Sequence, residues 1–245
     1  MCNNRCMERQ VNCLRYVNEE LEVIWVNGAV FVGVTDSGIL FDSPPGTVAA
    51  LGALSLLDGI RSIGYSSGRL SSIGGMVPLL HEMGKRQLRS FPFEVRGPAS
   101  DERVAILAEA FQRSWPSQLN VSVDSLFPGH IIDVGPLEIV GHGIEFGDLV
   151  GELPGRVVPG TGFVWEVNHN ATRIVWAKSC APSAELRRIC QRASLVIIEV
   201  AADPWPPTQR CFRMSVTAAT KIGGEADELW LVGDDGRLLD GGAVS

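Results

Sequence analysis

The sequence predicts a single α/β domain in which β-sheets are sandwiched between helices. Its 245 residues are enough to bury a substantial core, and a large α/β architecture suits a chain of this length. Hydrophobic residues make up 45% of the chain and charged residues 20%, as in globular proteins. Strands are followed by helices in two successive rounds, which favours a pseudo-symmetric sandwich. We therefore expect one domain over residues 1–245, with residues 1–20 as a candidate N-terminal extension.

The first round starts with a β-hairpin and a helix. Residues Leu21–Val26 and Ala29–Val34 are rich in β-branched and aromatic side chains, as strands are. Asn27 and Gly28 between them form a strong hairpin signal. A helix is expected over Thr47–Leu57, capped by its first residue because Thr is a favoured N-cap.

Residues Ser62–Glu82, SIGYSSGRLSSIGGMVPLLHE, predict a strand, a loop and a helix in close succession. The β run breaks at a Ser-Ser-Gly sequence, and a helix resumes from about Ser72. A junction of this kind points loop side chains into a cleft, where chemistry is commonly placed. Downstream we expect a strand over Leu88–Val95, then an amphipathic helix capped by Ser100.

The second round is expected to contain most of its strands before its first helix. Runs bounded by Gly, Pro and Asn predict strands at Ile131–Val134, Leu137–Val140, Gly162–Val167 and Arg173–Ala177. Repeated Gly and Pro residues predict a loop or loose hairpin over Gly147–Gly162. Helices are then expected at Pro182–Ala193 and Ser215–Ala226, and strands at Leu195–Val200 and Glu228–Val232.

The residues on both sides of the Ser-Ser-Gly loop resemble one known superfamily. Upstream lies Val30–Thr47, VFVGVTDSGILFDSPPGT, and downstream come Ile73, two glycines and Met76–Leu80. This order is similar to the metallo-β-lactamase superfamily, most of all to its ribonuclease Z-like branch. There a strand ending in Asp and a Gly-Thr turn precede a helix, and a later loop, H-x-H-x-D-H, runs into Ile-Gly-Gly-Leu. The resemblance implies a four-layer αββα sandwich of the metallo-β-lactamase type.

The metal-ligand positions of that loop fall on residues that do not suit a metal. They correspond to Ser67, Arg69, Ser71 and Ser72. A Ser hydroxyl is a poor neutral zinc ligand, and Arg is a fixed cation that repels a metal ion. Four losses cannot be repaired by one neighbour. The alternative interpretation is an ordinary Ser/Gly loop whose likeness to the family is chance.

The later metal motifs of the family are also incomplete. The segment Ile174–Pro182, IVWAKSCAP, is similar to one in which the family has a bridging Asp, and that position falls at Ser179. Glu199 keeps an acidic strand end, and His142 lies near the middle ligand region. The resemblance thus implies a vestigial pocket without metal, made of Asp42, Ser67, Arg69, Ser71, Ser72, His142, Ser179 and Glu199.

Two pocket residues have specific expected roles. Asp42 is most simply a structural carboxylate that accepts backbone hydrogen bonds. If the resemblance holds, the Arg69 guanidinium reaches the floor of the pocket, where a buried charge requires a partner such as Asp42 or Glu199. Alternatively, Arg69 and the loop hydroxyls bind a small anion from solvent, or Arg69 points outward into water.

Charge and cysteine content bound the environment and the partners. Lys and Arg number 21 against 28 Asp and Glu, a net charge of −7, whereas phosphate binding needs a basic face. We therefore expect no nucleic-acid partner, which argues against tRNA processing. The sequence contains no run of about eighteen apolar residues, so it predicts no membrane span. The N-terminus lacks the apolar core of a secretory signal. These features favour a cytoplasmic protein with reduced thiols at Cys2, Cys6, Cys13, Cys180, Cys190 and Cys211, a metal or redox role for the first three being the alternative.

The sequence favours a non-catalytic protein with no cofactor. We expect a degenerate family member, a pseudoenzyme, kept as a binding, assembly or regulatory component. It would associate with itself or with an unknown protein partner, for which the apolar stretch Trp205–Pro207 is a candidate exposed loop. The alternative is a hydrolase or phosphodiesterase with a rebuilt site that uses Asp42, His142, Cys180 and Glu199, with or without a metal.

Overall fold

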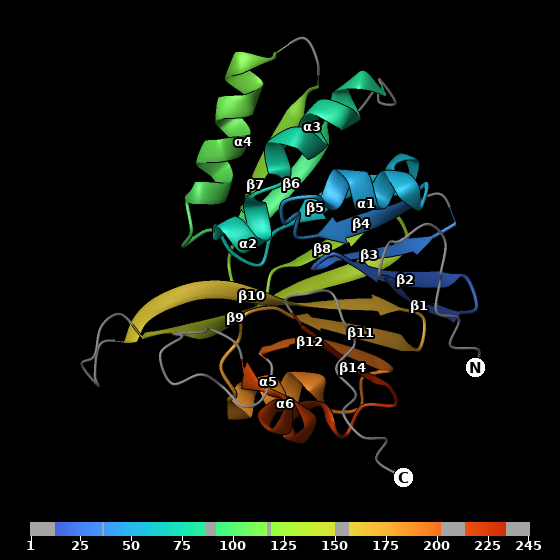
Figure 1. Cartoon of the computed structure of the whole chain (residues 1–245), viewed down its shortest axis with the longest axis vertical. Coiled ribbons are helices and arrows are strands. Elements are labelled where there is room, and N and C mark those ends of the chain that lie inside the picture. Colours follow the sequence, from blue (N-terminus) through green and yellow to red (C-terminus); the bar gives the residue numbers. More distant parts are fainter. Residues whose placement is uncertain are drawn as a thin grey trace.

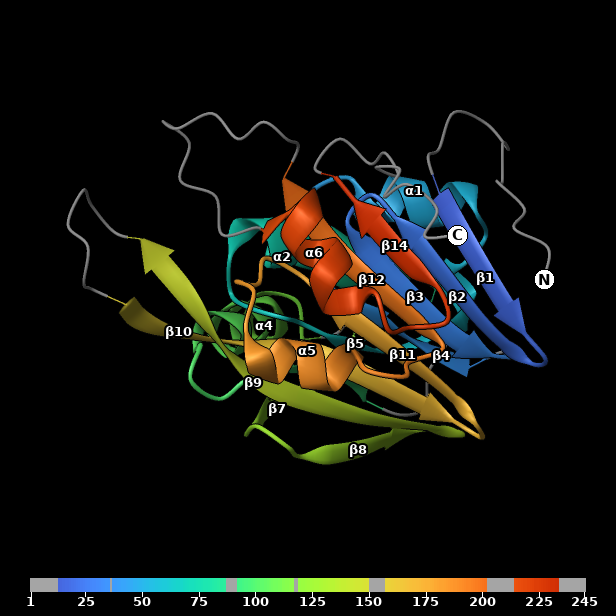
Figure 2. The same cartoon turned by 90° about the horizontal axis from the view of Figure 1, so that it is seen from below.

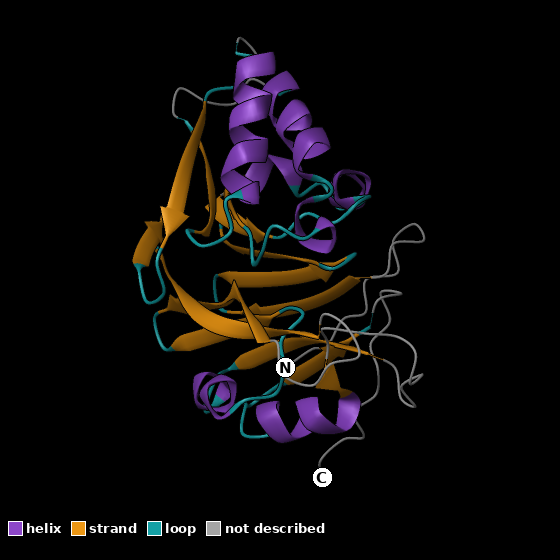
Figure 3. Ribbon diagram, turned by 90° about the vertical axis from the view of Figure 1, so that its left-hand side faces the viewer, coloured by secondary structure: helices purple, strands orange, loops and turns teal. Residues whose placement is uncertain are grey.

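Two β-sheets pack face to face, and helices cover the outer face of each sheet (Figure 1). The structure is a computed structural model that describes residues 13–35, 37–86, 92–116, 119–149, 157–201 and 214–233. Within these residues each sheet contains seven strands. Figure 3 shows the same four layers from the side, with the strands between two groups of helices.

The first sheet has its strands in chain order, from β1 to β7. Pairing is antiparallel from β1 to β4 and parallel from β4 to β7. The strands are β1 (Cys13–Asn18), β2 (Leu21–Val26), β3 (Ala29–Val34), β4 (Ser37–Phe41), β5 (Ile60–Gly64), β6 (Phe93–Pro98) and β7 (Val121–Leu126). The helices are α1 (Thr47–Ala53), the 3-10 turn η1 (Leu57–Gly59), α2 (Leu70–Ile73), α3 (Met76–Lys85) and α4 (Arg103–Ser114).

The second sheet runs in the order β13-β12-β11-β10-β9-β8, and β14 also pairs with β12. Pairing is antiparallel from β8 to β11 and parallel around β12. Its strands are β8 (Ile131–Val134), β9 (Leu137–Leu149), β10 (Val157–His169), β11 (Thr172–Ala177), β12 (Leu195–Ala201), β13 (Met214–Ser215) and β14 (Leu229–Val232). Its helices are α5 (Ala184–Cys190) and α6 (Val216–Gly223).

Apolar side chains fill the spaces between all four layers. One cluster lies between the first sheet and α1, α3 and α4, and another lies between the second sheet and α5 and α6. The cluster between the sheets contains Trp25, Trp165 and Trp176, each about 1% exposed or less. Alternate residues of each strand point to opposite faces, so buried strands such as β3 supply two clusters at once. The predicted αββα sandwich is confirmed.

Several element boundaries differ from those expected. The N-cap of α1 is Gly46, not Thr47, because the Thr47 hydroxyl donates to the Pro44 carbonyl at 2.7 Å instead of capping the helix. Helix α4 begins only at Arg103, so Ser100 does not cap it. Part of the span 1–20 is an edge strand, since β1 pairs with β2.

The expected loose connection over Gly147–Gly162 is a long hairpin. Strand β9 continues to Leu149 and β10 starts at Val157. β8 pairs only with residues 137–140 of β9, and β11 only with residues 165–169 of β10. The outer part of the hairpin therefore projects as a two-stranded ribbon (Figure 2).

Some expectations concern residues outside those that the structure describes. These are the candidate loop Trp205–Pro207, the start of the expected strand Leu88–Val95, and Cys2, Cys6 and Cys211. The described cysteines, Cys13, Cys180 and Cys190, are all buried, and Cys180 and Cys190 are free thiols. Among the described residues, no helix combines the length and the apolar character needed to cross a membrane.

Candidate functional site

The site lies where β4 and β5 end side by side. These strands are parallel neighbours, and Phe41 is in register with Gly64. The backbone N–H of Asp42 donates to the Gly64 carbonyl at 2.8 Å. Parallel pairing therefore brings Asp42 directly against the loop that follows β5, as the resemblance implied.

Asp42 is a buried carboxylate that holds this loop in place. Its Oδ1 accepts the backbone N–H of Ser66 at 2.9 Å, and its Oδ2 accepts the Ser66 hydroxyl at 2.8 Å. Oδ2 also accepts the indole N–H of Trp176, on β11 of the other sheet, at 2.9 Å. The expectation that Asp42 accepts backbone hydrogen bonds is confirmed.

The environment of Asp42 acts on its pKa in two directions. Burial raises the pKa, while the positive charge of Lys178 and the hydrogen bonds from Ser66 and Trp176 lower it. The net shift is upward because burial dominates. The backbone of Asp42 is left-handed, with φ of 61°, an uncommon conformation for a residue with a side chain.

The loop positions that hold metal ligands in the family contain hydroxyls and one guanidinium. Ser67 and Ser72 are buried, and their hydroxyl oxygens lie 3.4 Å apart. Ser71 contributes its backbone carbonyl, which accepts a hydrogen bond from Lys178 at 2.7 Å. The four positions offer no imidazole or carboxylate.

A second carboxylate, whose role the sequence did not indicate, fixes the middle of the loop. Asp101 accepts the backbone N–H of Gly68 at 2.6 Å and is bound at both oxygens by Arg103, each at 2.7 Å. Partial burial raises the pKa of Asp101, but the hydrogen bonds from Arg103 and Gly68 outweigh it and leave the pKa below its usual value. A Cβ at Gly68 would lie 2.4 Å from Asp101 Oδ1 and 2.6 Å from Arg103 Cβ. Glycine is required there.

The opposite side of the site comes from the ends of β11 and β12. The Ser179 hydroxyl donates to Glu199 Oε2 at 3.1 Å, and both residues are buried. Ser179 is also left-handed, with φ of 54°. Ser179 and Glu199, two of the three pocket residues expected from the second half of the chain, are therefore brought together, with a hydroxyl at the position of the bridging carboxylate.

Arg69 lies close to the same strand ends. Burial raises the pKa of the Cys180 thiol far above its ordinary value, and the charges of Glu199 and Asp42 raise it further, whereas Arg69 acts in the opposite direction. The charges of Glu199, Asp42 and Arg69 therefore all act on the buried Cys180 thiol, which places the three residues in its neighbourhood. The Arg69 Nη1 nitrogen is itself buried, which disfavours the alternative of a fully solvated side chain. Its pairing with Asp42 or Glu199 stays a prediction.

Lys178 is another residue whose role the sequence did not indicate. Its side chain is 1% exposed, and its ammonium donates to the carbonyls of Gly28 at 2.8 Å and Ser71 at 2.7 Å. Lysine is almost never fully buried unless it is paired. The available signal was a basic residue directly after a buried strand, one position before Ser179.

His142 does not join this group of residues. It is in register with Val164, which packs under α5 and α6, whereas the neighbouring Phe163 and Trp165 face the other sheet. A shift of one residue along a strand moves a side chain to the opposite face. His142 therefore lies on the outer face of the second sheet, apart from the site.

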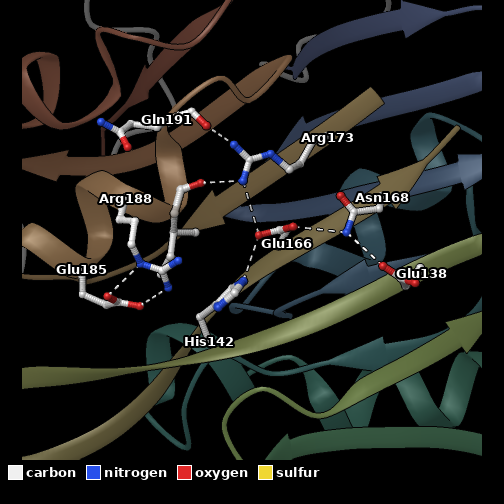
Figure 4. Close-up of polar contacts among 9 residues, drawn as sticks. Glu138, His142, Glu166, Asn168, Arg173, Glu185, Arg188 and Gln191 are labelled. Carbon is white, nitrogen blue, oxygen red and sulfur yellow. Dashed lines mark hydrogen bonds and ion pairs between the residues drawn. The ribbon is translucent and has the colours of Figure 1, made fainter. Parts of the chain in front are cut away.

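On that outer face His142 takes part in a separate polar network (Figure 4). Its Nε2 lies 2.9 Å from Glu166 Oε2, and Arg173 Nη1 lies 3.6 Å from the same oxygen. The hydrogen bond with His142 is the main cause that lowers the pKa of Glu166. Arg173 also donates to the carbonyls of Ile189 and Gln191 at the end of α5. The network ties three strands to a helix.

The residues at the site do not fit a zinc ion. Zinc sites in proteins use Cys, His, Asp or Glu ligands, and here hydroxyls and two cations surround the two carboxylates Asp42 and Glu199. Within the described part of the chain, no three His, Cys, Asp or Glu side chains form a group that could hold a metal ion.

The two mixed sheets and the helices that flank them form the metallo-β-lactamase fold, which this chain adopts. No protein-family model matches the sequence, and no curated protein matches it. Among solved structures, the chain is similar to the metallo-β-lactamase fold protein YhfI from Bacillus subtilis, with a TM-score of 0.64, 14% identity and 83% and 76% of the two chains covered.

Two enzymes are similar to the chain to the same degree. The short form of human tRNase Z matches with a TM-score of 0.64 and 16% identity over 83% of this chain and 84% of that one. A diphosphatase from the PhnP family matches with a TM-score of 0.62 and 13% identity over 84% and 73%. At these identities the likeness establishes the fold, which is shared with hydrolases.

Proposed function

We propose that this protein is a non-catalytic metallo-β-lactamase-fold protein, a pseudoenzyme that acts as a binding, assembly or regulatory component. The observation that carries the proposal is the role of Asp42. Its two carboxylate oxygens accept hydrogen bonds from Ser66 and Trp176, so the carboxylate holds the loop and the two sheets together.

The chemistry of the remaining groups supports this proposal. Hydrolysis by this fold requires a water molecule activated by a metal ion or by a general base. Hydroxyls such as those of Ser67 and Ser179 are neutral and weakly basic, and Arg69 and Lys178 are cations. Glu199 is the one carboxylate in this set, and the Ser179 hydroxyl already occupies one of its oxygens.

The rebuilt-site alternative has less support. It requires Asp42, His142, Cys180 and Glu199 to act together, and His142 lies on the outer face of the second sheet, bound to Glu166. The raised pKa of the buried Cys180 thiol disfavours the thiolate, which is the nucleophilic form. The four residues therefore do not converge on one substrate position.

The charges at the site bear on whether the loop binds a small anion. Arg69 and Lys178 supply two positive charges, and Asp42 and Glu199 lie beside them with two carboxylates. Because these charges balance, the loop has little surplus attraction for an anion. We therefore favour a macromolecular partner or self-association over anion binding.

Exposed apolar side chains offer candidate contact surfaces. Leu70, at the start of α2 beside the site, is 74% exposed, and Phe127, just after β7, is 69% exposed. Single exposed apolar residues are common on monomers, so each needs a direct test. Light scattering of the purified protein, and capture of partners from the native host, should give a complex that Leu70→Ser weakens. Val17→Ser, at an exposed position on β1 (60%), is the matched control.

Metal content and turnover test the absence of catalysis. We expect protein purified without chelator to contain no stoichiometric zinc, iron or manganese, and to hydrolyse phosphodiesters, β-lactams and thioesters no faster than background. A variant with Ser67→His, Arg69→His, Ser71→Asp, Ser72→His and Ser179→Asp is the positive control for metal binding, since it restores the family ligand types at these five positions. One equivalent of metal in the native protein, with turnover abolished by Asp42→Asn, would contradict the proposal.

A further inference from the structure

Lys178 joins three segments that are far apart in the sequence. It follows β11 directly, and its ammonium binds the Gly28 carbonyl in the β2–β3 turn, 150 residues away. It also binds the Ser71 carbonyl in α2, 107 residues away. One side chain therefore connects the segment that carries the former ligand positions, residues 67–72, which we call the ligand loop, to both sheets.

The surroundings of the ammonium are those of a cation site. Two carbonyl oxygens contact it directly, and its charge is the largest influence that opposes the upward shift of the Asp42 pKa. The ring of Trp176 lies 5.9 Å from Nζ, and its indole N–H binds Asp42. Carbonyl and carboxylate oxygens are the groups that proteins use to hold hard cations, and an aromatic face adds a weaker attraction.

Burying this charge requires such compensation. An ammonium group removed from water loses several kcal/mol of hydration, and a good fit with oxygen acceptors offsets the loss. Breaking one side of a buried charged contact is strongly destabilising because the other groups stay buried without a partner. A neutral apolar side chain at position 178 would donate no hydrogen bond to the carbonyls of Gly28 and Ser71.

We propose that the ammonium of Lys178 is the built-in cation of this site, where it takes the place of a bound metal ion and holds the ligand loop against both sheets. The proposal rests on the proposed function, since a chain that supplies its own cation needs no metal to close the loop. It assigns to Lys178 the role that the sequence suggested for Arg69. When the side chain is shortened, the vacated space should accept a primary alkylammonium ion.

Thermal unfolding of two variants tests the role of the charge. Lys178→Met keeps most of the stem but removes the charge, and we expect it to lower Tm by about 6 °C or more, as for a broken buried charge contact in a chain of this size. Lys178→Ala should lower Tm further. Lys85→Ala, at a side chain that is 71% exposed, is the control and should leave Tm nearly unchanged.

Chemical rescue tests whether the space is a cation site. Propylammonium chloride replaces the atoms that Lys178→Ala removes, so it should raise the Tm of this variant above its value in equal sodium chloride. Propanol should not raise it, and wild type and Lys178→Met should not respond. Equal rescue by propanol, or a Lys178→Met variant as stable as wild type, would overturn the proposal.

A double-mutant cycle covers the case in which Lys178→Ala does not fold. If the ammonium compensates Asp42, the loss caused by Lys178→Met should be smaller in an Asp42→Asn background. Additive losses would overturn the proposal. These measurements are independent of metal content and turnover. A metal-free, inactive protein in which Lys178 proves unimportant would therefore contradict only the present proposal, and an active protein that depends on Lys178 would contradict only the proposed function.

Discussion

Replacing Asp42 by Asn should show how strongly this carboxylate holds the site together. The substitution keeps the size of the side chain but leaves only one acceptor oxygen. If that oxygen takes the place of Oδ2, it can still accept from Ser66 Oγ and Trp176 Nε1, and the amide NH₂ then faces the backbone N–H of Ser66. One buried donor loses its acceptor.

The expected loss of stability follows from these contacts. An unsatisfied buried donor costs about 1–3 kcal/mol, and the attraction between Asp42 and Lys178 is also lost. Against this, Asn removes the cost of burying a charge, which is the main cause of the raised pKa of Asp42. We expect a net loss of about 1–3 kcal/mol near neutral pH, a fall in Tm of about 2–12 °C.

The pH dependence gives a sharper signature. Because the pKa of Asp42 is raised in the folded state, this carboxyl contributes stability that is fully present below its unfolded pKa of about 3.9. That contribution is lost as the pH rises through the folded-state pKa. The difference in stability between wild type and Asp42→Asn should therefore be largest near pH 4 and should shrink toward neutral pH.

Urea unfolding followed by tryptophan fluorescence, repeated between pH 4 and 8, measures both effects. Asp133→Asn, at an exposed position on β8, is the matched control and should change neither stability nor its pH dependence. Wild-type stability in Asp42→Asn at pH 7, together with an unchanged pH profile, would refute the reasoning.

Three further outcomes are expected. Gly68→Ala should destabilise by about 2–4 kcal/mol in urea unfolding, because the new Cβ overlaps Asp101; a loss below about 0.5 kcal/mol would contradict the packing. The lowered pKa of Glu166 contributes stability above pH about 4.3 that is lost as the pH falls through the folded-state pKa. His142→Ala should reduce the loss of unfolding free energy at acid pH, whereas the control His130→Ala, at an exposed position, should not. Equal pH profiles of stability for the two variants would contradict the contact between His142 and Glu166. Finally, EDTA should leave the Tm of wild type unchanged, and a fall of several degrees would indicate a structural metal.

The sequence by itself determined the features that depend on neighbouring residues. Asn27 and Gly28 specify the tight β2–β3 turn, and both have positive φ angles there, at 50° and 74°. Ser183 caps α5 by accepting the Leu186 N–H at 3.0 Å. The end of β4 just before Asp42, and the position of Glu199 near the end of β12, could also be read from short apolar runs. Such signals are local, so they survive without knowledge of the fold.

Only the tertiary structure decided which distant groups meet. His142 lies on the outer face of its sheet because strand register, set by pairing across the whole sheet, decides which face each residue occupies. Asp101 reaches Gly68 and Lys178 reaches Gly28 because packed layers bring their strand ends together. No periodicity encodes these contacts. Burial then determines the strength of these contacts, since a charge that water solvates readily needs hydrogen-bond partners in the protein once the two sheets enclose it.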